Sequence, residues 1–266
     1  MMSEQLLLVD PREHPSLSFG HLQATRVGSA EAIRAALKQA GKHALWIAPT
    51  GPAVELLIRA LDRQPRLSQR LLALGHSDAG RCELMRAHFY DVVSPHEGVR
   101  FLPLSELADV LGAPNRADLF IGGVVAQADS AIVLIRGSLD RLVVPVSWFR
   151  YRVAGPEPDP TRLAITDYGQ TVRLGDYEAA TDAILYEFDE RYRQRAKKRQ
   201  AETDTSFGGA LRRLRIQKEL RQSDFPGITA KEIARIERGE IKKPHQRTLA
   251  VIARRLGVPA DQIATY

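Results

Sequence analysis

Lysine and arginine side chains gather in the last quarter of the chain. Residues 191–266 contain 19 Lys and Arg but 8 Asp and Glu, a net charge of +11, whereas residues 1–190 contain 19 basic and 24 acidic groups, a net charge of −5. The densest basic run is RYRQRAKKRQ, Arg191–Gln200. Ammonium and guanidinium groups bind phosphate oxygens, so this asymmetry indicates a polyanionic partner for the C-terminal segment.

The other reactive groups form no recognisable catalytic or metal-binding pattern. Cys82 is the only cysteine, which excludes an intramolecular disulfide and a cysteine-built zinc site. The histidines are scattered without ligand spacing, and Asp10 ends a predicted strand without the acidic partners of a phosphoacceptor site. The turn Ala48–Pro52 (APTGP) lacks the Lys-Ser/Thr ending of a phosphate-binding loop. We therefore predict no enzyme, no metal site and no cofactor.

Length and composition are those of a globular protein with more than one domain. The chain has 266 residues, of which 44% are hydrophobic and 26% are charged. Its charge-free stretches have at most 12 residues, which is too few to cross a bilayer, and its first residues carry no export signal. We expect a cytoplasmic protein with no membrane partner.

Residues 1–115 alternate short apolar runs with helical spacing. The predicted strands are Gln5–Val9, His43–Ile47, Arg70–Leu74, Tyr90–Val93 and Val99–Leu102. The predicted helices are Ala30–Gln39, with Ser29 as its N-cap, Ala53–Asp62 and Ser105–Leu111. Strands that alternate with helices predict an α/β domain with a largely parallel sheet.

Residues 116–185 are rich in Val, Ile and Leu runs separated by turn residues. The predicted strands are Asp118–Val125, Ala131–Arg136, Arg141–Trp148 and Leu163–Thr166. The sequence Arg136-Gly137-Ser138 suits a hairpin turn between two of them. This pattern predicts a small, mostly antiparallel β domain.

The rest of the chain is predicted to be helical. Residues 186–206 read as a basic helix followed by a short polar linker, and residues 207–266 as a separate all-α domain. The helical segments predicted there are Gly209–Glu219, Gln222–Phe225, Ala230–Arg238 and Gln246–Leu256. Thr229 and Glu232 have the spacing of a capping box. Short helices, a tight turn and a capped helix presenting Lys231 and Arg235 describe a helix-turn-helix. Taken with the α/β segment and the β domain before it, this domain makes the whole chain a predicted α+β multidomain protein.

The C-terminal segment resembles the Cro/xenobiotic-response-element family of helix-turn-helix domains, related to the lambda-type phage repressors. Three stretches carry the resemblance: RLRIQKELRQSDF (Arg213–Phe225), GITAKEIARIERG (Gly227–Gly239) and KKPHQRTLAVIARRLGV (Lys242–Val258). It implies that Ala230–Arg238 is a recognition helix that enters the major groove. Two departures stand out: the stretch after Phe225 is shorter than usual for the family, and Glu219 occupies a turn position where glycine is common.

The resemblance also implies roles for individual residues. The base-contacting positions are matched by Thr229, Ala230, Lys231 and Arg235. Phosphate contacts are expected from Arg221, Gln222, Lys242, Lys243, His245 and Arg247. Arg215 and Glu237 match a pair that forms an internal salt bridge in similar domains. Lys231 and Arg235 can each donate to guanine O6 and N7, whereas Ala230 offers only a methyl group to thymine.

Residues 116–185 are similar to a small β domain of unknown function that is often fused in front of this kind of helix-turn-helix. The similarity lies in Val144–Phe149 (VPVSWF), Tyr168–Val172 (YGQTV) and Asp176. It implies a fold and an association with regulators, but no chemistry.

Together these patterns predict a transcription regulator with a Cro/C1-type helix-turn-helix that binds double-stranded DNA as a homodimer. Residues 1–185 would then dimerise the protein or bind a protein or small-molecule partner. The alternative is an antitoxin-like or accessory interaction module whose helix-turn-helix serves autoregulation. A third candidate, an enzyme that uses the α/β segment on a small molecule, has the least support in the sequence.

Overall fold

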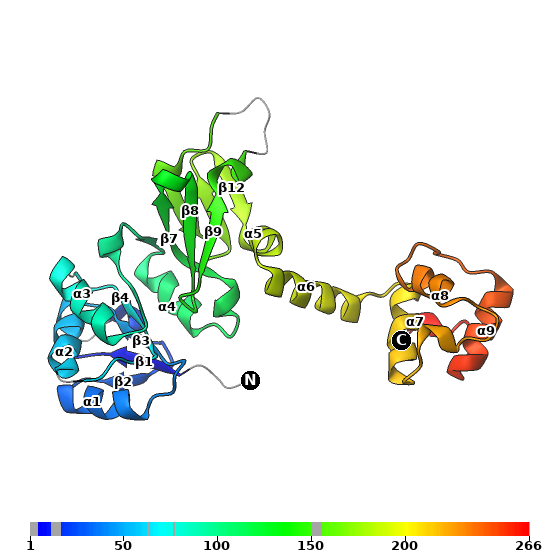
Figure 1. The fold of residues 1–266 in the computed structure, drawn as a ribbon, viewed down its shortest axis with the longest axis horizontal. Helices are drawn as coiled ribbons and strands as arrows, with labels where there is room; N and C mark the ends of the chain where they lie inside the picture. Colours follow the sequence, from blue (N-terminus) through cyan, green and yellow to red (C-terminus); the bar gives the residue numbers. More distant parts are fainter. Residues whose placement is uncertain (1–4, 12–16, 63, 77, 151–155, 266) are drawn as a thin grey trace. The chain divides into compact units, whose positions relative to one another are not determined.

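The computed structural model describes residues 5–11, 17–62, 64–76, 78–150 and 156–265. The chain separates into two compact units, Met1–Asp189 and Glu190–Tyr266 (Figure 1). Parallel and antiparallel sheets occur together with helices, so the predicted mixture of α and β structure is confirmed. Within the described ranges, no helix combines the length and the apolar character that a membrane span requires.

A parallel five-stranded sheet opens the first unit, in the order β2-β1-β3-β4-β5. Its strands are β1 (Leu6–Val9), β2 (Thr25–Val27), β3 (Leu45–Ala48), β4 (Arg70–Ala73) and β5 (Asp91–Val93). Three helices connect them: α1 (Ala30–Gln39), α2 (Gly51–Leu61) and α3 (Ala79–His88). Strands β1 and β3 are apolar and buried along their whole length, as expected for a parallel sheet covered on both faces.

The helices of this layer begin at capping side chains. The hydroxyl groups of Ser29 and Thr50 and the carboxylate of Asp78 accept backbone N–H groups at the starts of α1, α2 and α3. All three helices pack with Trp46 in one apolar core on a single face of the sheet. Four predicted strands and the predicted helices Ala30–Gln39 and Ala53–Asp62 are confirmed as β1, β3, β4, β5, α1 and α2. Helix α3 and strand β2 are not among the predicted elements, and β2 is too short and too exposed to give a strand pattern.

Antiparallel structure completes the first unit. One sheet has the order β6-β7-β8-β9, with β6 (Arg100–Phe101), β7 (Phe120–Ala126), β8 (Ala131–Arg136) and β9 (Arg141–Pro145). A second sheet contains β10 (Leu163–Thr166), β11 (Thr171–Leu174) and β12 (Tyr177–Ala180). Helix α4 (Leu104–Gly112) follows β6, and α5 (Thr181–Phe188) follows β12.

Two strand predictions for this part of the chain are wrong. The strand predicted over Val99–Leu102 corresponds to β6, which does not belong to the parallel sheet, and the strand predicted over Arg141–Trp148 is longer than β9. Strand β6 pairs with β7, so the antiparallel layer begins before residue 116. The predicted strand Arg141–Trp148 stops at Pro145, and Val146–Phe149 forms a 3-10 helix. Proline fixes φ and has no N–H to donate, so it ends the pairing with β8.

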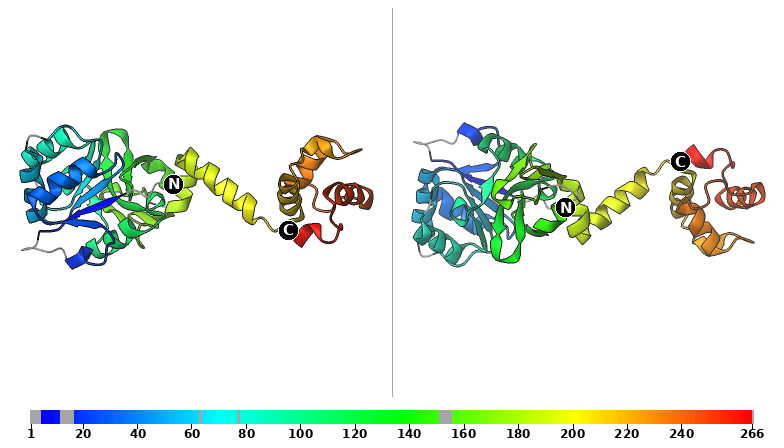
Figure 2. Two further views of the ribbon diagram at one scale, coloured as in Figure 1. Left: turned by 90° about the horizontal axis from the view of Figure 1, so that it is seen from below. Right: turned by 90° about the horizontal axis from the view of Figure 1, so that it is seen from above.

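The described part of the second unit consists of helices, coloured from yellow to red in Figure 2. They are α6 (Glu190–Thr203), α7 (Phe207–Gln217), the 3-10 turn Gln222–Asp224, α8 (Ala230–Glu237), α9 (Gln246–Leu256) and a last 3-10 turn, Ile263–Thr265. One apolar core holds together the elements from α7 onward, and α6 contributes no described residue to it. The core is built from Leu211, Leu214, Phe225, Ile233, Ile236, Ile252, Leu256 and Ile263. The predicted helix over 222–225 is therefore a single 3-10 turn, and the predicted helix over 230–238 ends at Glu237, with Arg238 as its cap.

Candidate nucleic-acid interface

Helix α8 is positioned by its cap and by its apolar side. The Thr229 hydroxyl accepts a hydrogen bond from the backbone N–H of Glu232 at 3.1 Å, which is one half of the predicted capping box. Ile233 and Ile236 are fully buried in the core of the unit. Because helical residues three apart share one face, burying these two side chains turns the opposite face of α8 toward solvent.

The four residues matched to base contacts all lie at the solvent side of α8. Thr229, Ala230, Lys231 and Arg235 are exposed. Lys231 and Arg235 are one helical turn apart, so their cationic ends project from one face. The structure therefore brings these residues together on one accessible surface.

The residues matched to phosphate contacts divide into two groups. Five of them are exposed: Arg221, Lys242, Lys243, His245 and Arg247. Gln222 is only half exposed, and its amide nitrogen donates to Oε2 of Glu237 at 2.8 Å. The structure thus places the Gln222 side chain in an internal network, a role that the resemblance does not imply.

Arg215 and Glu237 form a two-pronged ion pair between α7 and α8. Nε of Arg215 lies 2.6 Å from Oε1 of Glu237, and its Nη2 lies 3.0 Å from Oε2. The side chains are 12% and 4% exposed, and Nη1 of Arg215 also donates to the carbonyl oxygen of Leu220 at 2.9 Å. A bidentate pair of charged groups is stronger than a single hydrogen bond and has a defined geometry. The Arg215–Glu237 pair therefore fixes α8 against α7 and against the turn that follows α7.

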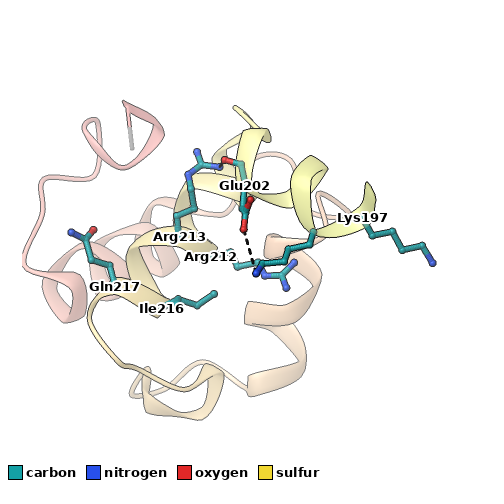
Figure 3. Close-up of a pocket in the computed structure, with 7 residues that line it drawn as sticks. Lys197, Glu202, Arg212, Arg213, Ile216 and Gln217 are labelled. Carbon is teal, nitrogen blue, oxygen red and sulfur yellow. Dashed lines mark hydrogen bonds and ion pairs between the residues drawn. The ribbon is translucent and has the colours of Figure 1, made fainter. Parts of the chain in front are cut away.

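The surface beyond α8 contains a second cationic feature, a groove of about 640 Å³ between α6 and α7 (Figure 3). Its lining residues are Lys197, Lys198, Glu202, Arg212, Arg213, Ile216 and Gln217. Arg213 donates to the backbone carbonyl of Asp204, and Lys198 lies 3.9 Å from Glu202. Ile216 has 57% of its surface exposed, so it belongs to this groove and not to the core in which its apolar character would place it.

Two residues to which the sequence analysis assigns no role, Arg238 and Glu240, adjoin the exposed face of α8. The Glu240 carboxylate follows the helix and accepts hydrogen bonds from Nε of Arg238 at 2.7 Å and from Nε of Arg235 at 3.2 Å. These hydrogen bonds, that from Arg238 first, hold the pKa of the Glu240 carboxyl below its ordinary value of 4.5, so it is anionic at neutral pH. A carboxylate five residues after an arginine is a pattern too common to be recognised in a sequence.

The groups of this surface suit electrostatic binding and hydrogen bonding to a polyanion. Within the described residues, no cluster of His, Cys, Asp and Glu has the arrangement of a metal site. Comparisons with models of known protein families, with curated proteins and with solved structures give no significant match for this chain.

Proposed function

We propose that the protein is a sequence-specific DNA-binding regulator whose helix α8 enters the major groove. The observation that carries the proposal is a short, capped helix with one face buried and Lys231 and Arg235 exposed on the other. A helix of this size fits the major groove, where lysine and arginine read guanine through O6 and N7. The net charge of +11 on residues 191–266 adds attraction to any duplex.

The elements around α8 support a helix-turn-helix of unusual proportions. A helix-turn-helix motif has a first helix directly before its recognition helix, and here the 3-10 turn Gln222–Asp224 takes the place of that first helix. Gly227, with φ +75°, then turns the chain toward Thr229. The ion pair between Arg215 and Glu237 compensates for the short first helix because it ties α8 directly to α7. The exposed residues Lys242, Lys243 and Arg247, beyond α8, would contact phosphates and fix the register of the domain on the duplex.

The remaining parts of the chain have simpler roles in this proposal. The exposed side chains of Lys197 and Lys198 on α6 add phosphate attraction without reading sequence. The unit Met1–Asp189 pairs two copies or senses a signal, in the cytoplasm. A twofold dimer would bind a near-palindromic site with half-sites about 34–36 Å apart.

A salt titration of the full-length protein on a fluorescein-labelled duplex tests the electrostatic part of the proposal. If about six phosphates are neutralised, log K should fall with log salt at a slope near −5. The measurement is fluorescence anisotropy at rising potassium chloride concentration. A flat response, or no change in anisotropy at low salt, would contradict the proposal.

A further inference from the structure

One carboxylate joins two arginines at the end of α8. Oε2 of Glu240 lies 3.2 Å from Nε of Arg235, and Oε1 lies 2.7 Å from Nε of Arg238. The three side chains remain between 46% and 58% exposed. Exposed ion pairs of this kind add little to stability, so removing Glu240 should leave the unit folded.

The backbone holds Glu240 where it can reach Arg235. The backbone N–H of Glu240 donates to the carbonyl oxygen of Arg235 at 3.0 Å, and that of Ile241 donates to the same oxygen at 3.4 Å. Gly239, with φ +73°, makes the left-handed turn that brings the chain back over the last turn of α8. The Cα of Glu240 is therefore fixed relative to Arg235 by the helix-ending turn itself.

The contact with Arg235 uses the part of the guanidinium group that base recognition does not need. A guanidinium has five N–H donors, and guanine O6 and N7 are read by two of them. Holding Nε leaves both Nη groups available to a base. It also restricts a long side chain whose ordering on binding would otherwise cost affinity.

From these contacts we infer that Glu240 is a positioning residue that holds the Arg235 guanidinium ready for base recognition, while Arg238 fixes the carboxylate from its other oxygen. The inference rests on the proposed function. It means that an acidic residue helps to determine which DNA sequence a basic surface binds. The competing interpretation is that Glu240 is only a negative charge near DNA, in which case its removal should strengthen binding to every duplex.

The experiment compares the full-length wild-type protein with Glu240→Gln on two duplexes. One is the sequence that the wild-type protein enriches from a random duplex library, and the other is a scrambled duplex of the same composition. Asp261→Asn is the matched control, because it removes one exposed negative charge of the same unit from the segment after α9. Melting temperatures check that every variant is folded.

We expect Glu240→Gln to lower the ratio of selected to scrambled affinity about two- to tenfold, the range expected when one long side chain must be ordered on binding. Its affinity for the scrambled duplex should stay equal or rise, as in Asp261→Asn. In an Arg235→Ala background, Glu240→Gln should leave the ratio unchanged, because it acts through Arg235.

Three results would overturn the inference. They are an unchanged or higher ratio in Glu240→Gln, the same loss of ratio in Asp261→Asn, and an undiminished effect of Glu240→Gln in the Arg235→Ala background. A wild-type protein that enriches no sequence would instead contradict the proposed function, and the inference with it.

Discussion

Gly208 of α7 lies directly against the backbone carbonyl oxygen of Ile236 in α8. A β-carbon at this position would overlap that oxygen and would also come within 3.0 Å of the carbonyl oxygen of Glu237. Neither atom can move without shifting the end of α8, because both belong to its backbone. The two helices therefore touch main chain to main chain, which sets how α8 is presented.

Gly208→Ala should destabilise the C-terminal unit by about 1–3 kcal/mol, the range for forcing extra volume into a packed site. The measurement is hydrogen exchange of the α7 and α8 amides in the full-length protein. Gly41→Ala is the control, since a β-carbon there would meet nothing within 4 Å. Equal protection in Gly208→Ala and wild type would contradict the close approach.

The buried ion pair predicts a large effect of Glu237→Ala. Removing this carboxylate leaves Arg215 buried without its counter-charge and also removes the acceptor of the Gln222 amide. Breaking one partner of a buried pair costs about 3–5 kcal/mol. Denaturant unfolding monitored by exchange in α7 and α8 measures this loss, and Arg235→Ala, which alters an exposed side chain, should show little change. A double variant, Arg215→Met with Glu237→Leu, should be more stable than Glu237→Ala, because it leaves no buried charge unpaired.

Glu219 has φ +54°, in the left-handed region that side chains other than glycine disfavour. Glu219→Gly relieves this strain but increases the freedom of the unfolded chain, so the two effects partly cancel. We expect a net gain of roughly 0.5 kcal/mol in the free energy of unfolding, and no gain in Glu219→Ala, which keeps a β-carbon. Thermal melting of the three proteins decides the matter, and a loss of stability in Glu219→Gly would show that the turn carries no strain.

The Asp204 carboxyl group makes the folding stability of the protein depend on pH. Its carboxylate accepts the backbone N–H of Ser206 at 2.9 Å, and the hydrogen bonds from Ser206, with the charge of Arg213, lower the pKa of Asp204 below its ordinary value of 3.8. A carboxyl group with a lowered pKa in the folded state stabilises it above pH 3.8, and this contribution is lost as the pH falls through the folded pKa.

Asp204→Asn should therefore lower the melting temperature at neutral pH, and the difference from wild type should shrink below pH 3.8. Thermal melts from pH 7 down to pH 2 provide the comparison. A difference that stays constant over this range would mean that the charge of Asp204 contributes nothing.

Local signals explain which elements can be predicted from the sequence. Helices α1 and α9 are found at the predicted residues, Ala30–Gln39 and Gln246–Leu256, because apolar spacing and clear start or stop residues agree in both. Strands β1 and β3 are apolar runs bounded by turn residues and are recognised for the same reason. In each case the information lies within a few residues of the element.

Long-range contacts explain which features of the structure could not be predicted from the sequence. The pairing of β6 with β7 cannot be read from the short run around Arg100, and strands β11 and β12 are short and partly polar. Ile216 is apolar like Leu211 and Leu214, but the helix carries it to the exposed groove. The link between Glu240 and Arg235 exists only because the turn at Gly239 reverses the chain.

Selection from a random duplex library tests the central claim, that α8 reads DNA sequence. The full-length wild-type protein and the variants Lys231→Ala and Arg235→Ala are each allowed to enrich duplexes, and the enriched sequences are compared. We expect the wild type to enrich one near-palindromic motif. Each variant should lose preference at some positions while still binding DNA at low salt. Enrichment of an identical motif by all three proteins, or of none by the wild type, would contradict the account.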